Sequence, residues 1–207
     1  MIRALIFDCD GVLFDSWDAN VAFYNAVLAA LGCPALDAEG ERLAHRLSTP
    51  QLFEQLFEGD DERLTEARAV ARQLDYGPFY PLMRPVPGLY DLLRQLRARY
   101  RLAMATNRGM TVGGVMAHFG LGSFLELAVG INDVARPKPF PDMLERCLTH
   151  FGLDAEEALY VGDAVSDYAA ARAAGMPFVA VGEETGAPVR IRDLTELPGL
   201  LADGRRR

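Results

Sequence analysis

The sequence predicts an α/β fold, with a parallel sheet covered by helices and a small all-α domain inserted into it. Short apolar runs alternate with segments of helical periodicity through most of the 207 residues, as in βαβ units. Residues 16–82 break this alternation, because their pattern is helical throughout. We therefore expect an α/β core from residues 1–15 and 83–207 and a separate helical domain from residues 16–82.

The core elements follow one another as strand and helix. The predicted strands, all short apolar runs, are 2–7, 102–106, 127–129, 158–162 and 178–181. The predicted core helices are 89–100, 143–151 and 168–174. A proline shortly precedes each of the first two helices and a glycine follows the third, which are common start and stop signals.

The inserted segment carries helix signals of its own. The predicted helices are 17–31, 38–47, 51–57 and 60–76. Thr49 and Pro50 form a cap-then-proline start for the third of them. Several prolines between residues 78 and 87 indicate a stiff connection back to the sheet.

Composition limits the possible partners and locations. The net charge of −8, without a basic stripe, disfavours nucleic acid and anionic membranes, because neutralising phosphates requires clustered Lys and Arg. No apolar run reaches the roughly 20 residues of a membrane span. Cys9, Cys33 and Cys147 form no metal-binding or disulfide pattern, which fits reduced packing residues. We expect a cytoplasmic protein.

A pair of aspartates ends the first predicted strand. Asp8 and Asp10 are separated by one residue and followed by Gly11. Residues i and i+2 of a strand point to the same side, and ligands bind at the carboxyl edge of α/β sheets. The pair could therefore address a phosphate with its cation, although Asp and Gly also serve ordinary turns.

A second acidic pair follows the strand 158–162. A helix starting at Asp163 would place Asp167 on the same face, although an N-cap with a favourable helix-dipole charge would explain both residues as well. Like charges about 4 Å apart repel by roughly 4 kcal/mol at an effective dielectric near 20. Four converging carboxylates therefore require a cation or a bound proton, and Mg²⁺ suits carboxylates together with a substrate phosphate.

Hydrogen-bond donors end the second predicted strand. Thr106, Asn107 and Arg108 suit phosphate oxygens, although an ordinary turn uses similar residues. Lys138 is more discriminating, because it is the only lysine in the sequence and stands between two prolines. The use of lysine in a sequence otherwise rich in arginine indicates that this position needs a compact ammonium group, which a planar guanidinium cannot replace.

The four segments, in this order, resemble the motifs of the haloacid dehalogenase superfamily of aspartate-nucleophile phosphatases. The motifs are Asp8-x-Asp10-Gly-Val, Thr106-Asn107, Lys138 in a Lys-Pro-x-Pro-Asp context, and Gly-Asp163-x-x-x-Asp167. The helical insertion resembles the cap of the subfamily that contains phosphoglycolate phosphatases, sugar-phosphate phosphatases and β-phosphoglucomutase. The resemblance implies a Rossmann-like core and a cap domain, 16–82, that acts as a lid.

The resemblance also implies roles for single residues. Asp8 would attack phosphorus, and Asp10 would act as acid and then as base. Lys138 and Thr106 would stabilise the transferring group. The implied Mg²⁺ ligands are Asp8, Asp10 through its backbone carbonyl, Asp163 and Asp167. The implied substrate-binding residues at the sheet edge are Asn107 and Arg108. Arg46 of the cap could bind a substrate carboxylate or second phosphate, although an exposed arginine at a helix end explains it equally well and Arg42 offers the same contact by helical spacing.

Departures from some relatives narrow the expected reaction. The presence of Asp10 disfavours dehalogenation, and the cap has no lysine for phosphonate cleavage. Asn20 stands where β-phosphoglucomutase has a cap histidine, which disfavours the mutase. We expect hydrolysis of small phosphomonoesters, phosphoglycolate-like or sugar phosphates, by a monomer or a dimer. The alternatives are a β-phosphoglucomutase-type phosphotransferase and a non-catalytic phosphate-binding regulatory protein.

Overall fold

The computed structural model describes residues 1–182 and 185–203, apart from the side chains of residues 45, 46 and 203. The chain forms two compact units. One contains Met1–Asp15 together with Pro85–Arg207, and the other contains Ser16–Arg84. The chain thus leaves the first unit after Asp15 and returns to it at Pro85.

A six-stranded parallel sheet, counted over the described residues, forms the centre of the first unit. Its order is β5-β4-β1-β6-β7-β8. The strands are β1 (Ala4–Phe7), β4 (Arg101–Ala105), β5 (Leu127–Val129), β6 (Ala158–Gly162), β7 (Phe178–Val181) and β8 (Arg190–Ile191). Two further short strands, β2 (Phe14–Asp15) and β3 (Arg84–Pro85), form a separate pair. The expected α/β class with a parallel sheet is confirmed.

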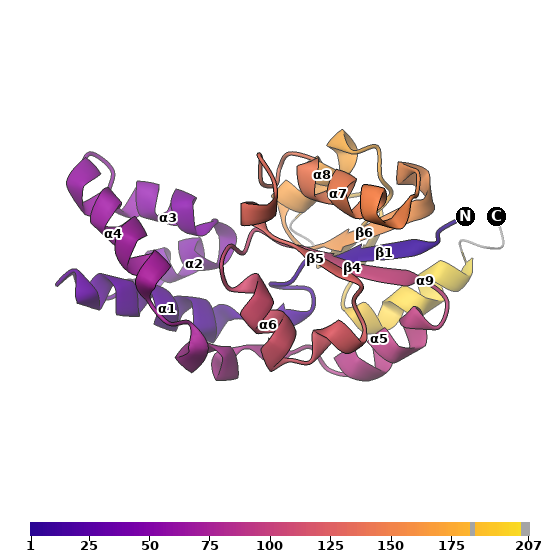
Figure 1. The fold of residues 1–207 in the computed structure, drawn as a ribbon, viewed down its shortest axis with the longest axis horizontal. Helices are drawn as coiled ribbons and strands as arrows, with labels where there is room; N and C mark the ends of the chain where they lie inside the picture. The colour runs from indigo at the N-terminus through magenta and orange to yellow at the C-terminus, as the bar shows by residue number, and fades with distance from the viewer. Residues whose placement is uncertain (183–184, 204–207) are drawn as a thin grey trace. The chain divides into compact units, whose positions relative to one another are not determined.

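Helices cover both faces of this sheet, as a parallel sheet requires. Figure 1 shows α7 (Asp142–Phe151) and α8 (Val165–Ala173) on one face. On the other face lie α5 (Leu89–Arg97), α6 (Val112–His118) and α9 (Leu197–Asp203). The chain builds β4 and β5 on one side of β1 before it crosses to β6 on the other. This reversal creates a switch point at β1, where α/β proteins bind ligands.

The core of the sheet follows the two-residue period of its strands. Ala4 and Ile6 pack with Tyr160 in the apolar cluster that also contains the buried face of α7. Leu5 and Phe7 alternate with them and are fully buried as well. Because the side chains on both faces of β1 are apolar and buried, the polar residues of this segment come only after the strand ends.

The second unit is helical, as the pattern of residues 16–82 predicts. Its helices are α1 (Trp17–Ala30), α2 (Ala38–Arg46), α3 (Thr49–Leu56), α4 (Asp61–Gln73) and the 3₁₀ segment η1 (Gly77–Leu82). Aromatic rings hold it together. Phe23 packs against Tyr24 and Tyr76, and Tyr24 packs edge-on against Phe53. Edge-on packing is a favoured geometry for buried rings.

Helix α6, strand β8 and helix α9 of the first unit have no counterpart in the sequence prediction. Helix α6 contains two adjacent glycines, which lower its helix propensity, and β8 has two residues. The predicted helix ends also differ from the observed ones by a few residues. In the described part of the chain, no helix combines the length and the apolar character needed to cross a membrane.

Candidate active site

Polar residues gather where three neighbouring strands of the sheet end. Asp8 follows β1, Thr106 follows β4 and Asp163 follows β6. Backbone hydrogen bonds extend the ladder into this edge, since the Asp8 amide donates to the Val161 carbonyl at 2.9 Å and the Thr106 amide to the Val129 carbonyl at 2.9 Å. The strands therefore fix the positions of the first polar residues that follow them.

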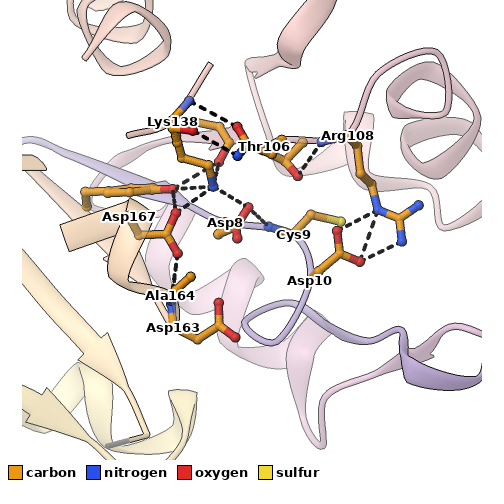
Figure 2. Close-up of polar contacts among 12 residues, drawn as sticks. Asp8, Cys9, Asp10, Thr106, Arg108, Lys138, Asp163, Ala164 and Asp167 are labelled. Carbon is orange, nitrogen blue, oxygen red and sulfur yellow. Dashed lines mark hydrogen bonds and ion pairs between the residues drawn. The ribbon is translucent and has the colours of Figure 1, made fainter. Parts of the chain in front are cut away.

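Lys138 lies at the centre of this edge, with its side chain almost fully buried (2 % exposed). Figure 2 shows its ammonium directed toward Asp8 and Asp167. Nζ is 2.9 Å from Asp8 Oδ1 and 2.6 Å from Asp167 Oδ1. It also lies 3.0 Å from the Tyr160 hydroxyl and 3.3 Å from the Ala105 carbonyl. One buried cation thus links the ends of β1, β4 and β6.

Tyr160 is a member of this site that the sequence analysis missed. Its hydroxyl lies 2.8 Å from Asp167 Oδ1 and 3.1 Å from the Ala105 carbonyl oxygen. If Lys138 donates to Asp8, Asp167 and Tyr160, and Tyr160 donates to Ala105, all four acceptors receive a proton. A tyrosine inside a fully buried strand needs a hydrogen-bond partner for its hydroxyl. Its place in the apolar run 158–162 was therefore the sequence signal that could have identified Tyr160 as a site residue.

Asp167 accepts hydrogen bonds on both carboxylate oxygens. Oδ1 accepts the Lys138 ammonium at 2.6 Å and lies 2.8 Å from the Tyr160 hydroxyl. Oδ2 accepts the backbone amides of Asp163 at 3.2 Å and Ala164 at 3.0 Å. The predicted stacking of Asp163 and Asp167 on one helical face is wrong, because α8 begins after Asp163, at Val165. Instead, Asp167 reaches back to the turn that carries Asp163, as in a capping interaction.

Asp163 lies across the edge from Lys138, against the backbone of Gly11. A Cβ added to Gly11 would stand 1.9 Å from Asp163 Oδ2, so glycine is required for this close approach. Gly11 also has a φ of +74°, in the left-handed region. The turn after β1 is therefore shaped to admit the Asp163 carboxylate.

Burial and charge perturb the pKa values of these carboxyl groups. Burial raises the pKa of Asp8 to about 7, against the opposing effect of Lys138 and with help from Asp167 and Asp10. Burial, followed by repulsion from Asp8 and Asp167, raises the pKa of Asp163 to about 8. Burial opposes the charge of Lys138, but Asp167 and Asp8 outweigh it and raise its pKa. The three carboxyl groups of Asp8, Asp163 and Asp167 thus outnumber the ammonium group of Lys138.

The residues present fit a divalent cation. Asp8, Asp163 and Asp167 each offer a carboxylate oxygen, and these three atoms lie within 4.8 Å of one another. Because both oxygens of Asp167 already accept hydrogen bonds, Asp8 and Asp163 are the better placed ligands and Asp167 would support them. A hard cation with oxygen ligands, such as Mg²⁺, matches this donor set.

Asn107 fastens the loop that carries Lys138. Its side-chain amide donates to the Lys138 carbonyl at 3.2 Å, and its side-chain oxygen accepts the Lys138 amide at 3.1 Å. The neighbouring Thr106 is buried, and its hydroxyl oxygen accepts the Arg108 amide at 3.2 Å. Side chains at the end of β4 thus hold two backbone segments in place.

The remaining predicted site residues lie apart from the carboxylate cluster or outside the described side chains. Asp10 is not a member of the three-carboxylate group, and Arg108 binds its carboxylate with contacts of 2.6–3.1 Å. Arg46 ends α2, and its side chain lies outside the part of the chain that the structure describes. The structure therefore brings together Asp8, Lys138, Asp163 and Asp167.

Comparison with known proteins agrees with this geometry. The family model for haloacid dehalogenase-like hydrolases matches residues 5–181. A phosphoglycolate phosphatase of Chromobacterium violaceum is 32% identical, over 98% of this chain and 98% of that protein. Pyrophosphatase PpaX of Halalkalibacterium halodurans is 28% identical, over 87% of this chain and 84% of that protein.

A solved structure shows the same relationship. The crystal structure of a HAD-superfamily hydrolase, subfamily IA, variant 1, from Geobacter sulfurreducens has 36% sequence identity and a TM-score of 0.80. It covers 97% of this chain and 96% of that chain. The resemblance predicted from the four motifs is confirmed. The chain therefore belongs to the haloacid dehalogenase-like hydrolases of subfamily IA, and it is an enzyme similar to their phosphoglycolate phosphatases.

Proposed function

We propose that this protein is a Mg²⁺-dependent phosphatase that hydrolyses small phosphomonoesters through an aspartyl-phosphate on Asp8. The contact that carries this proposal is the buried ion pair between Lys138 Nζ and Asp8 Oδ1, at 2.9 Å. It gives a nucleophilic carboxylate a fixed orientation and a positive charge beside it. Asp163 stands on the opposite side, where a cation would complete the neutralisation.

Asp8 and Asp10 divide the chemistry between them. In the first step an oxygen of Asp8 bonds to phosphorus while the bond from phosphorus to the leaving oxygen breaks, and Asp10 donates a proton to that oxygen. In the second step water bonds to phosphorus, the bond to Asp8 breaks, and Asp10 takes the proton of the water. One water is consumed, and alcohol and phosphate are released.

The other residues at this edge of the sheet neutralise charge and hold the reacting groups in position. Lys138 favours the ionised form of Asp8 against the effect of burial, and it neutralises charge on the transferring group, aided by the Thr106 hydroxyl. Bound Mg²⁺, held by Asp8, the Asp10 carbonyl and Asp163, would offset the repulsion between an anionic nucleophile and an anionic substrate. Asn107 keeps the Lys138 loop in register with β4.

The names of relatives and the helical unit support a substrate class for this proposal. A relative that aligns over almost the whole chain bears the name phosphoglycolate phosphatase, which supports a small phosphomonoester with an anionic leaving group. We propose that residues 16–82 act as a cap that selects this leaving group, with Arg46 as one contact. The name pyrophosphatase for other relatives makes inorganic pyrophosphate the comparison substrate.

A substrate panel tests the proposal. Purified protein with Mg²⁺ is assayed for phosphate release from 2-phosphoglycolate, glucose 6-phosphate, β-glucose 1-phosphate and pyrophosphate, and kcat/KM is compared. We expect turnover of the first two, and none by Asp8→Asn. Retained hydrolysis by Asp8→Asn would refute the nucleophile, and preferred cleavage of pyrophosphate would refute the substrate class.

A further inference from the structure

An ion pair between Arg108 and Asp10 lies at this edge, and the proposed reaction gives Arg108 no role. Nε of Arg108 lies 3.1 Å from Oδ1 and 2.8 Å from Oδ2 of Asp10, and its NH2 lies 2.6 Å from Oδ1. Both carboxylate oxygens are thus bound by one planar guanidinium. Such two-pronged contacts fix orientation as well as attraction.

Burial makes this pair more than a surface ion pair. The side chain of Arg108 is 7% exposed and that of Asp10 is 25% exposed. Exposed pairs of this kind contribute little to stability, because water and side-chain freedom compete with them. The arginine is thus almost fully buried while a quarter of the Asp10 side chain stays exposed, as a group that must meet a substrate requires.

The backbone around Arg108 is fixed on both sides. Its amide donates to the Thr106 hydroxyl at 3.2 Å, and its carbonyl accepts the Ile131 amide at 3.0 Å. A Cβ added to Gly130 would stand 2.6 Å from that carbonyl, so the loop after β5 packs directly on it. The guanidinium therefore projects from a rigid base, as a positioning group should.

Figure 2 shows Asp10 directed toward Arg108, while Asp8 is directed toward Lys138. Each of the two aspartates after β1 thus pairs with a different cationic side chain. We propose that Arg108 is a positioning residue, which aims the Asp10 carboxyl group and does not itself hold the substrate. Asp10 is protonated when it faces the leaving oxygen in the first step, and it is ionised when it takes the proton of water in the second. This inference rests on the proposed phosphatase function, and it adds a residue to its machinery.

The proposal predicts a dependence on the leaving group. Breaking the ester bond of an alkyl phosphate requires the proton of Asp10, whereas p-nitrophenolate leaves without one. A misaimed Asp10 therefore slows the first step for alkyl substrates alone, and it slows the second step, in which water loses a proton, for every substrate. Loss of a substrate-binding group would instead raise KM.

The test uses Arg108→Gln with Mg²⁺ and three substrates. These are p-nitrophenyl phosphate, 2-phosphoglycolate and glycerol 1-phosphate, which is an alkyl ester without a carboxylate. For p-nitrophenyl phosphate we expect a stopped-flow burst near the wild-type rate, followed by slow turnover. For both alkyl esters we expect kcat to fall about 100-fold with KM within about threefold, since acid–base catalysis contributes at least this factor.

Two further variants make the result specific. Asp10→Asn should give the same pattern, and the double variant should be no slower than Asp10→Asn alone, because the two residues act as one unit. Arg108→Lys, which keeps the charge without the fork, should recover part of kcat. Arg101→Gln is the matched control, since Arg101 also pairs with a single carboxylate, that of Glu126, but begins β4 at its opposite end.

The outcomes separate the inference from the function on which it rests. A raised KM with unchanged kcat, an effect on 2-phosphoglycolate alone, or fully additive losses in the double variant would overturn the positioning role while the phosphatase stands. An equal kcat loss in a folded Arg101→Gln would overturn it too. Absence of turnover by the wild-type protein on all three substrates would overturn the proposed function and the inference together.

Discussion

Replacing Lys138 with methionine removes the one positive charge that joins Asp8 and Asp167 in the buried edge of the sheet. The ammonium lies 2.9 Å and 2.6 Å from these two carboxylates, which are 7% and 0% exposed as residues. Methionine has a similar length and no charge, so the substitution tests electrostatics with little change in packed volume.

The expected loss of stability is large. Breaking a buried ion pair from one side costs about 3–5 kcal/mol, because the remaining charge is left uncompensated. Here two carboxylates lose their partner, and Asp163 adds its repulsion. At roughly 2–4 °C per kcal/mol for a chain of this size, the unfolding midpoint of the metal-free protein should fall by about 10 °C.

Urea unfolding followed by circular dichroism measures this effect, with Arg101→Gln as the control. Arg101 and Glu126 are about two-fifths exposed, so their pair should contribute only about 0–1 kcal/mol. If Lys138→Met loses no more free energy of unfolding than Arg101→Gln at pH 8, the electrostatic account of this edge is wrong. The Lys138→Met variant should also lose Mg²⁺-dependent turnover.

Three further predictions concern the same edge. Tyr160→Phe should cost about 1–2 kcal/mol and lower kcat more than it changes KM, because Lys138 loses an acceptor; an unchanged kcat with Mg²⁺ would contradict this. Gly11→Ala should abolish the Mg²⁺-induced rise in thermal midpoint, since its Cβ would meet the Asp163 carboxylate; an undiminished rise would count against the close approach. The pKa values of Asp8 and Asp163 are raised to about 7 and about 8, so folding binds protons and the metal-free protein should lose about 2–4 kcal/mol between pH 6 and pH 8, with Mg²⁺ stabilising more at pH 8; flat urea midpoints across that range would refute it.

The arrangement of the sheet could be predicted from the sequence because buried parallel strands have a strong signal. Each predicted strand overlaps an observed one, and 127–129, 158–162 and 178–181 match in both ends. Helix ends were less predictable. The helix expected at 89–100 stops at Arg97, and a turn over 98–100 leads into β4, although no glycine or proline in the sequence marks that stop.

The site was predictable to the extent that strand ends determine it. Asp8, Thr106 and Asp163 follow β1, β4 and β6, and parallel order brings such positions to one edge. Pairings among side chains were not predictable in this way. Arg108 could have served a phosphate or any of the carboxylates, and the sequence holds nothing that selects Asp10.

The Asn107 side chain and the Lys138 backbone exchange two hydrogen bonds, and this joins segments that are 31 residues apart in the chain. With β1, β4 and β6 also contributing, the site exists only after most of the sheet has assembled. A ligand bound there is therefore linked to cooperative unfolding of the whole first unit and not to opening of a single loop. Slowed amide exchange should accordingly spread through all the central strands when a phosphate analogue binds, which makes the site a reporter on the folding of the sheet.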